Sequence, residues 1–259
     1  MSFGDRERFG GIVRLFGPEG MDRLAAAHAC VVGIGGVGVW AVESLARTGI
    51  GHLTLIDLDD LCVTNVNRQL HALEETVGRS KIEVMEQRIR SISPACEVHL
   101  HHQFLTPSNA RNLVVPGMDV VVDAIDAMDA KCSLLATCRA QEIPVVTCGG
   151  AGGKREAAKV RVKDLTMATN DRLLRRVRKV LRRDHGFSRD PNAPFGIPAV
   201  YCEEDARLLR VDGSVVTEAE EGVRISCDAG LGTASFVTGT VGLLAAGEAV
   251  RLLLGETFR

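Results

Sequence analysis

Residues 29–38, with the sequence Ala-Cys-Val-Val-Gly-Ile-Gly-Gly-Val-Gly, decide the fold of this chain of 259 residues. The first half is a short apolar run rich in β-branched residues, which is typical of a buried strand. The second half opens a helical stretch that extends to about Thr48. Backbone amides at a helix N-terminus attract phosphate, and glycine lets the chain approach a phosphate closely. The stretch therefore predicts a nucleotide-binding loop, whose glycines are Gly33, Gly35, Gly36 and Gly38.

Apolar runs and helical spacings alternate along the rest of the chain. Further strands are predicted at 52–57, 97–101, 119–125, 143–148 and 159–163, and helices at 80–92, 106–114 and 129–140. This alternation predicts an α/β fold, a mostly parallel Rossmann-like sheet with helices on both faces. We expect a single domain over residues 1–259, with a C-terminal α+β extension and a basic and acidic insertion at 170–225.

The composition excludes several classes of protein. Hydrophobic residues make up 46% and charged residues 25% of the chain, which excludes a disordered or fibrous protein. The eight cysteines are scattered with no Cys-x-x-Cys pair, so the sequence predicts neither a disulfide scaffold nor a structural zinc site. The first residues contain no apolar segment of the kind that directs secretion. We therefore expect a reducing compartment, the cytoplasm.

Polar and charged residues follow the second predicted strand, and they narrow the choice of nucleotide. Asp57 ends this strand 19 residues after Gly38, where a carboxylate hydrogen-bonds a ribose. The glycine loop and this carboxylate are compatible with NAD, FAD and ATP alike. The next candidates are Asp59, Asn65, Arg68, Gln69, Lys81 and Asp126. Cations and a carboxylate-held Mg²⁺ offset the charge on a leaving pyrophosphate, so this set favours ATP attacked at its α-phosphate. The alternative for Arg68 and Lys81 is that each is a solvated surface charge.

These residues also carry a family resemblance. The segments that carry it are Gly33–Gly38, Leu45–Gly51, Asp57, Asn65–Gln69, Lys81 and Asp126. Together they resemble the adenylation domain of the ubiquitin-activating (E1-like, ThiF/MoeB) superfamily. The resemblance implies an E1-type adenylation fold in which the glycines hold the phosphates of ATP and Asp57 holds the ribose. It also implies that Asn65, Arg68 and Lys81 contact the triphosphate and that Asp126 supports Mg²⁺.

Other segments are similar to one branch of that superfamily, the bacterial tRNA threonylcarbamoyladenosine dehydratases. These segments are Arg8–Gly11, Arg14–Gly17, Asn67–Leu73, Thr147–Gly153 and Cys227–Gly232. The resemblance implies ATP-dependent cyclisation of N6-threonylcarbamoyladenosine at tRNA position 37 through a carboxyl-adenylate. It implies a homodimer, in which Arg8 or Arg14 completes the partner's site. It also marks Cys227 as a candidate catalytic or sulfur-accepting thiol, which leaves a cysteine desulfurase system open as a partner.

Two alternative functions stay open at this stage. The first is activation of the C-terminus of a ubiquitin-like sulfur-carrier protein. Members of the superfamily with that activity usually hold zinc with two Cys-x-x-Cys pairs, and this chain has none. The second is a non-catalytic sulfur-relay or RNA-binding module on a degenerate nucleotide fold. The presence of all the candidate ATP-binding residues argues against such a module.

A basic segment follows the α/β part of the chain. Residues 154–189 contain 13 Lys or Arg and 4 Asp or Glu, a local charge of +9 in a chain whose net charge is −2. Within it, Leu and Val recur with the spacing of one helical stripe, and basic side chains occupy the rest of the circumference. This pattern favours contact with the phosphate backbone of tRNA, and the alternative is an ordinary exposed helix. The predicted tRNA-binding residues are Arg172, Arg175, Arg176, Arg178, Lys179, Arg182 and Arg183.

The chain ends with an apolar run. Residues 230–247 contain no charged side chain, which is close to the length that spans a membrane. Several glycines and threonines lower its hydrophobicity, and Glu248 and Arg251 follow it. A buried helix that lies on the sheet and at a dimer contact accounts for the run. Peripheral or single-span membrane association is the alternative interpretation.

Overall fold

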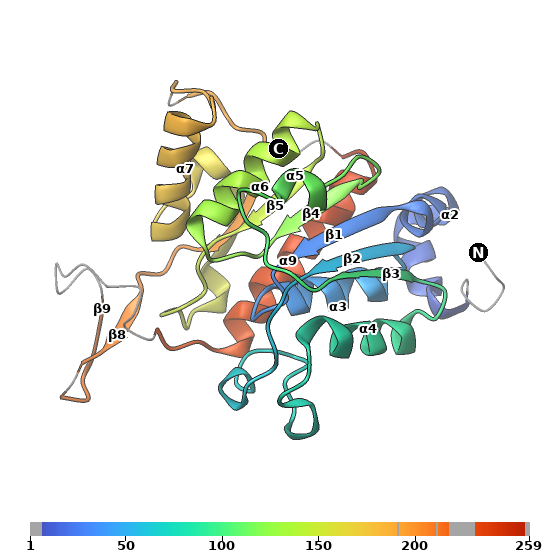
Figure 1. Ribbon diagram of the computed structural model, residues 1–259, viewed down its shortest axis with the longest axis horizontal. Helices are drawn as coiled ribbons and strands as arrows, with labels where there is room; N and C mark the ends of the chain where they lie inside the picture. Colours follow the sequence, from blue (N-terminus) through green and yellow to red (C-terminus); the bar gives the residue numbers. More distant parts are fainter. Residues whose placement is uncertain (1–6, 191, 211, 218–230, 257–259) are drawn as a thin grey trace.

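The structure is a computed structural model that describes residues 7–190, 192–210, 212–217 and 231–256. Its centre is a seven-stranded sheet with the order β3-β2-β1-β4-β5-β7-β6 (Figure 1). The strands are β1 (His28–Val32), β2 (His52–Ile56), β3 (Glu97–His101), β4 (Val120–Asp123), β5 (Val145–Cys148), β6 (Val160–Asp164) and β7 (Pro198–Cys202). Every neighbouring pair is parallel except β6 with β7, which is antiparallel. The expected mostly parallel α/β sheet is confirmed.

The winding of the sheet reverses at β1. This strand pairs with β2 on one side and with β4 on the other, so the chain builds the sheet outward in both directions. In such sheets, ligands bind outside the carboxyl ends of the strands at the point of reversal. The glycine loop follows β1, Asp57 follows β2 and Asp126 follows β4. The topology therefore brings three of the predicted segments to one edge of the sheet.

Helices cover both faces of the sheet, as the sequence predicts. One face carries α3 (Gly38–Thr48), α4 (Lys81–Ile92) and α9 (Ser235–Leu253), and the other carries α5 (Ala110–Leu113), α6 (Met128–Ala140) and α7 (Arg172–Asp184) (Figure 1). Alternate residues of a strand point to opposite faces. Accordingly, Ala29 and Val31 of β1 pack in the core beneath α3, whereas Cys30 and Val32 pack in the core beneath α6.

The connections contain shorter elements. They are the 3₁₀ turns η1 (Val63–Asn65), η2 (Glu74–Thr76), η3 (Ala157–Lys159) and η4 (Leu165–Met167), and the two-stranded hairpin β8 (Arg207–Leu209) and β9 (Val215–Thr217). Before β1 the chain forms α2 (Gly10–Ala26), in which Gly17 has a φ of 75° and precedes Pro18. A left-handed residue followed by proline interrupts regular helix geometry. The parts of α2 on either side of Gly17 are therefore distinct helical pieces.

The structure differs from the expectations in two of the predicted segments. The helix predicted at 106–114 is the single turn α5, because Pro107 and the Asn109 side chain start the segment as a turn in which Asn109 Oδ1 accepts from Thr106 N at 2.7 Å. The expected insertion at 170–225 contains β7, which lies between β5 and β6 in the sheet. This part of the segment therefore completes the body of the fold, and α7 packs on the same face as α6.

The apolar run of the sequence forms α9. By length and composition this helix could cross a membrane, but half of its most apolar window is buried inside the molecule. Its buried side chains include Val241, Ala245 and Ala249, which belong to the core on the α3 face. A Cβ atom on Gly242 would lie 2.3 Å from the carbonyl oxygen of Val37, so the backbones of α9 and the α3 segment are nearly in contact. In the described structure α9 packs as a core helix.

Candidate nucleotide-binding site

The glycine loop joins β1 to α3 with a backbone geometry that only glycine allows. Gly33 has a φ of 88°, and a Cβ atom there would lie 2.9 Å from the carbonyl oxygen of Ala124. A Cβ atom on Gly38 would lie 1.8 Å from the carbonyl oxygen of Gly33, so the first turn of α3 rests directly on the loop. At Gly35, by contrast, a Cβ atom would have no neighbour within 4 Å. The loop is thus closed on the protein side and open where a phosphate would approach.

The carboxylate of Asp57 holds this loop in place. It is 7% exposed, and its two oxygens accept hydrogen bonds from Ile34 N at 2.6 Å and from Asp59 N at 2.9 Å. A carboxylate has about four acceptor positions, so two remain for the hydroxyl groups of a ribose. The position matches the predicted ribose-binding role, and the two bonds show that Asp57 also shapes the loop.

A lysine and an arginine flank the glycine loop. Lys81, at the start of α4, has a side chain 7% exposed, and its Nζ lies 2.7 Å from Asp59 Oδ2. The methylene groups of Arg68 pack on Gly36, where a Cβ atom would lie 3.4 Å from Arg68 Cδ. Both side chains therefore lie at the edge where the sequence predicts them. Asp59 serves here as the partner of Lys81.

The guanidinium of Arg68 is held by its own segment. Its Nη1 donates to Thr64 O at 2.8 Å and to Asn67 Oδ1 at 3.0 Å. An arginine offers five donors, so the remaining nitrogens are available to an anion. Asn65 shapes the same segment, because its Oδ1 accepts from Cys62 N at 3.0 Å and caps η1. The Asn65–Gln69 segment is thus a folded unit that presents Arg68 above Gly36.

Two buried polar side chains beside the loop have unsatisfied atoms. The Oε1 atom of Gln69 and both ring nitrogens of His71 are buried without a hydrogen-bond partner among the described residues. Burial lowers the pKa of His71 to about 4, and the charge of Lys81 acts in the same direction. The backbone of Ile34 lies close enough to the ring to act in the opposite direction. Because buried polar atoms are normally paired, Gln69 marks a position where a ligand fits. The sequence analysis included Gln69 but not His71.

Asp126 lies at the carboxyl edge after β4 and is exposed. The described residues provide no hydrogen bond or ion pair to its carboxylate, which leaves both oxygens available to a ligand. A free carboxylate at this edge suits Mg²⁺, which prefers oxygen ligands. The predicted metal role thus has the required donor, and it stays a prediction.

A buried ion pair beneath Asp126 was missed by the sequence analysis. Asp123 and Lys131 are both 0% exposed, and Lys131 Nζ lies 2.9 Å from Asp123 Oδ2. Lys131 also donates to the carbonyl of Ile125 at 2.9 Å, and Thr147 Oγ1 donates to Asp123 at 2.7 Å. These bonds fix the turn that carries Asp126. A signal in the sequence could have found the pair. Asp123 is a charged residue that ends an apolar strand, and Lys131 follows it eight residues later on an apolar face of a helix.

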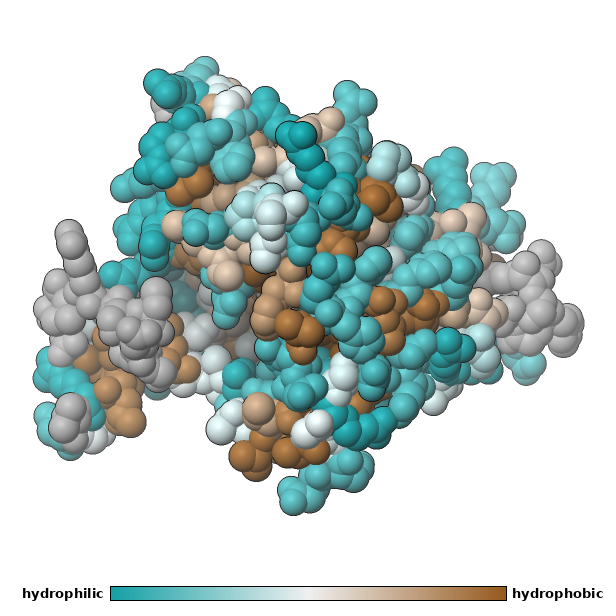
Figure 2. Space-filling model, in the orientation of Figure 1, coloured by the Kyte–Doolittle hydropathy of each residue, from teal (hydrophilic) through white to brown (hydrophobic). Residues whose placement is uncertain are grey.

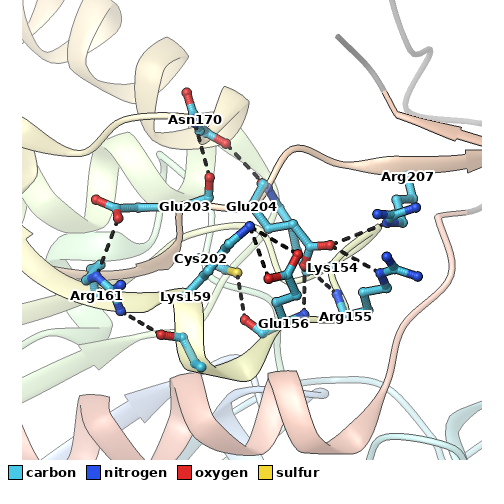
Figure 3. Close-up of polar contacts among 11 residues, drawn as sticks. Lys154, Arg155, Glu156, Lys159, Arg161, Asn170, Cys202, Glu203, Glu204 and Arg207 are labelled. Atoms are coloured by element: carbon cyan, nitrogen blue, oxygen red, sulfur yellow. Dashed lines mark hydrogen bonds and ion pairs between the residues drawn. The ribbon is translucent and has the colours of Figure 1, made fainter. Parts of the chain in front are cut away.

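A second buried network fixes the glycine-rich loop at 149–153, which follows β5 at the same edge. Figure 3 shows the polar contacts of this network. Lys154 is 7% exposed and donates to the carbonyl oxygens of Glu204 and Asn170. The Glu204 carboxylate accepts from the backbone amides of Arg155 and Glu156 at 2.7 and 2.8 Å. Although burial opposes it, these amides lower the pKa of the Glu204 carboxyl. The network anchors the loop to the end of β7.

Asp171 connects this loop to the basic helix. Its carboxylate caps α7 by accepting from Leu174 N at 2.8 Å, and it also accepts from Gly150 N at 2.9 Å. Burial raises the pKa of the Asp171 carboxyl. A Cβ atom on Gly149 would lie 2.2 Å from Asp171 Oδ2, which explains glycine at that position. The N-terminus of α7 is therefore tied to the edge that carries the nucleotide loop.

The segment 231–234 bridges the two halves of this edge. Gly232 O accepts from Gly153 N at 2.7 Å, and Thr233 O accepts from Asn67 Nδ2 at 2.9 Å. The segment leads into α9, whose Thr238 lies 3.4 Å from the carbonyl oxygen of Arg68. One stretch of backbone thus contacts both the loop after β5 and the segment that carries Arg68.

The seven basic side chains predicted to bind tRNA differ in their surroundings. Leu174, Val177 and Leu181 bury one side of α7, and the opposite side is hydrophilic (Figure 2). The structure gives partners to three basic residues: Arg178 (Leu165 O, 3.2 Å), Arg182 (Ser188 O, 3.1 Å) and Arg183 (Asp184, 2.7 Å). In the part of the chain that the structure describes, three others are exposed without an ion pair: Arg175, Arg176 and Lys179. Arg172 is half-buried at the start of the helix.

The remaining candidates lie elsewhere. Arg8 donates to the carbonyl of Ile92 at 3.0 Å. Ile92 is the last residue of α4 and Lys81 is the first. The contact of Arg8 is therefore roughly 16 Å from Lys81, because a helix rises about 1.5 Å per residue. Arg14 is exposed on α2. Neither arginine lies at the nucleotide edge of its own chain.

The candidate thiol Cys227 lies outside the described residues. Of the described cysteines only Cys62 is exposed, and burial raises the pKa of Cys148, next to the edge, to about 12.

Comparison with known proteins assigns the family. The ThiF family model matches residues 10–258 of the chain. This chain belongs to the ThiF family. The resemblance that the sequence motifs indicate is therefore confirmed.

Relatives of this ThiF-family chain cover nearly its full length. It is 44% identical over 257 residues to the tRNA threonylcarbamoyladenosine dehydratase of Escherichia coli, covering 98% of this chain and 96% of the relative. It is also 44% identical over 248 residues to the enzyme of that name from Haemophilus influenzae, covering 96% and 94%. The crystal structure of the E. coli enzyme in complex with ATP has a TM-score of 0.86, with 42% identity, and the match covers 98% of this chain and 96% of that chain.

Proposed function

We propose that this chain uses ATP to cyclise N6-threonylcarbamoyladenosine at position 37 of tRNA, with loss of one water from the nucleoside. The observation that carries the proposal is the similarity to two dehydratases of that name, 44% in identity over 96–98% of the chain. The arrangement of the nucleotide edge supports it. A glycine loop flanked by Arg68 and Lys81 suits a triphosphate better than a dinucleotide, because the pyrophosphate that leaves carries high charge.

The reaction in this proposal has two steps. A carboxylate oxygen of the threonylcarbamoyl group attacks the α-phosphate of ATP, and pyrophosphate leaves. The ureido nitrogen of the same group then attacks the activated carbonyl carbon, loses its proton and expels AMP, which keeps the carboxylate oxygen. Because both reacting groups of the second step belong to one substituent, closure of the five-membered ring costs little entropy.

The residues of the chain mainly bind and orient in this mechanism. The amides of the glycine loop and the cations Arg68 and Lys81 hold the phosphates, while Asp57 holds the ribose. The unpaired Oε1 of Gln69 and the open space over Gly35 fit a bound nucleotide. Asp126 would hold Mg²⁺, which neutralises charge on the phosphates when it is bound. The basic side chains of α7 place tRNA beside this edge.

The alternative substrate is the C-terminus of a ubiquitin-like sulfur-carrier protein. The chemistry of the first step is the same, so the nucleotide edge does not distinguish the two. The lack of Cys-x-x-Cys pairs and the exposed basic residues of α7 favour tRNA.

The test is incubation of the chain with ATP, Mg²⁺ and threonylcarbamoyl-modified tRNA, followed by mass analysis of the nucleosides. We expect a loss of one water from the modified nucleoside and release of one AMP for each nucleoside converted. The matched control is the same tRNA without the modification, which should release no AMP. An unchanged nucleoside mass, or AMP release that depends on a protein ending in Gly-Gly, would refute the proposal.

The variant Asp126→Ala tests the metal assignment within the proposal. It should abolish ATP–pyrophosphate exchange and leave the fold intact, because Asp126 is exposed and makes no hydrogen bond to described residues. Exchange at the rate of the unmodified chain would remove Asp126 from the mechanism.

A further inference from the structure

A cluster of histidines lies far from the nucleotide edge, at the start of β2 and β3. His52 and Glu97 are Cα partners in the parallel pairing of these strands, and His99 follows Glu97 by two residues. Alternate residues of a strand point to the same face, so all three side chains project from one face of the sheet. Their side chains are 41%, 60% and 45% exposed, which leaves them accessible to an ion from solvent.

The ligand atoms of this cluster converge. His52 Nδ1 lies 3.2 Å from one carboxylate oxygen of Glu97, and His99 Nε2 lies 3.3 Å from the other. One ligand atom from each of the three side chains lies within 4.8 Å of the other two. A tetrahedral zinc ion with bonds of about 2.0–2.2 Å separates its ligands by roughly 3.3–3.6 Å. The donors are thus already close to the spacing that a metal requires.

The surroundings hold these side chains in place. Two neighbouring strands of one sheet carry them, and β3 is the edge strand of that sheet. The ring of His28, on β1, lies with its centroid 6.0 Å from that of His52 and 5.8 Å from that of His99. His28 Nε2 is occupied by Thr54 Oγ1 at 2.8 Å, so His28 packs beside the cluster as a neighbour.

We propose that His52, Glu97 and His99 bind a divalent transition-metal ion, with solvent in the fourth position. Two imidazole nitrogens and one carboxylate suit Zn²⁺, Co²⁺ or Ni²⁺, whereas Mg²⁺ prefers an all-oxygen site. The cluster lies at the amino ends of the strands, where His52 precedes Asp57 by five residues, roughly 17 Å along β2 at about 3.3 Å per residue. The site is therefore separate from the nucleotide edge and its Mg²⁺. A bound ion would tie the edge strand β3 to β2.

The test uses the full chain without an affinity tag, stripped of metal with a chelator and titrated with Co²⁺ in excess Mg²⁺. We expect one Co²⁺ per chain with visible absorption bands of a nitrogen- and oxygen-ligated ion, displaced by Zn²⁺. The variants His52→Ala, Glu97→Gln and His99→Ala should each weaken binding at least tenfold. Zn²⁺ should raise the Tm of the unmodified chain more than that of Glu97→Gln, because ligand binding stabilises the state that binds it.

The matched control is His102→Ala. His102 is also exposed, at 47%, and also faces a glutamate, since its Nε2 lies 3.8 Å from Glu83 Oε1. This variant should leave the Co²⁺ isotherm unchanged. Absence of binding by the unmodified chain, or equal weakening by His102→Ala and by the three site variants, would overturn the proposal.

Discussion

His71 is a neutral imidazole enclosed beside a phosphate-binding loop. It is 2% exposed, and its two ring nitrogens have no partner among the described residues. A protonated ring there would bring a second positive charge close to Lys81 in a site that water does not reach. The protein therefore keeps this ring uncharged near neutral pH and keeps the local positive charge on Lys81 and Arg68.

This burial makes stability depend on pH. Because the pKa of His71 falls from 6.5 to about 4 on folding, the unfolded chain binds more protons between these values. The stability contributed by the neutral ring is fully present above pH 6.5 and is lost as pH falls toward 4. Linkage predicts a loss of about 2 kcal/mol between pH 7 and pH 5 from this residue.

Urea unfolding of the chain and of His71→Leu at the two pH values measures this loss. The variant should lose about 2 kcal/mol less than the unmodified chain on acidification. The control His102→Gln, at an exposed histidine, should behave as the unmodified chain. Equal losses for His71→Leu and the unmodified chain would show that His71 does not titrate in this range.

The sequence pattern predicts the positions of Asp57 and Lys81 in the fold, because one follows a predicted strand and the other opens a predicted helix. Their contacts with ATP come from the family resemblance and stay predictions. Lys131 and His71 lie on apolar helix or loop positions, and their burial depends on contacts across the sheet. The spacing of Asp123 and Lys131 in the sequence hints at their pairing, but local patterns do not show how deeply either side chain is buried.

At the scale of elements, the turn between β4 and α6 depends on one buried ion pair. Removing one partner of a buried pair typically costs about 3–5 kcal/mol, because the other charge is left without compensation. Lys131→Met should therefore lower the free energy of unfolding by an amount of this order, measured by urea unfolding. The double variant Asp123→Leu/Lys131→Met should recover much of the loss. A single variant as stable as the unmodified chain would contradict this account.

The helix α7 should contribute to tRNA binding through charge alone. The double variant Arg175→Gln/Arg176→Gln should bind tRNA more weakly. It should also reduce the slope of the logarithm of the binding constant against the logarithm of the salt concentration by about 2. Each lost arginine leaves one phosphate without a cationic partner and accounts for about 1 of this change. Filter binding over a range of salt concentrations measures both quantities. The matched control is Arg79→Gln/Arg90→Gln, which removes the same charge around α4, on the other face of the sheet. Equal effects of the two pairs would contradict a specific role of α7.

The strands show where sequence patterns suffice. The strands predicted at 52–57 and 97–101 coincide almost residue for residue with β2 and β3. Short apolar or alternating runs of this length seldom form any other element. β7 was missed because Pro194 and Pro198 are typical of loops, although proline is tolerated as the first residue of a strand. The order of the strands, and hence the antiparallel position of β6, depends on pairing between distant segments.

At the scale of the whole molecule, the packing of α9 against α3 unites the C-terminus with the nucleotide loop. A Cβ atom on Gly242 would lie 2.3 Å from Val37 O and 2.8 Å from Trp40 Cβ. Gly242→Ala should therefore destabilise the chain by several kcal/mol, on the order of 3 kcal/mol, since neither backbone can move alone. Gly247→Ala is the matched control, because a Cβ atom there has no neighbour within 4 Å.

Thermal or urea unfolding of both variants distinguishes the two positions. Gly247→Ala should be neutral or more stable by up to about 1 kcal/mol, the difference in helix propensity between the two residues. If both variants unfolded like the unmodified chain, α9 would not pack on α3 in solution. That result would favour the membrane interpretation of the apolar run.

The glycine loop has a genetic consequence. Every amino acid other than glycine has a Cβ atom, and at position 38 this atom would lie 1.8 Å from Gly33 O. Any missense change at that codon forces the backbone of the loop to shift, so such alleles should yield much less folded protein. At Gly35 the chain itself leaves the space free. Missense alleles there should accumulate as folded protein that fails only when a nucleotide has to enter.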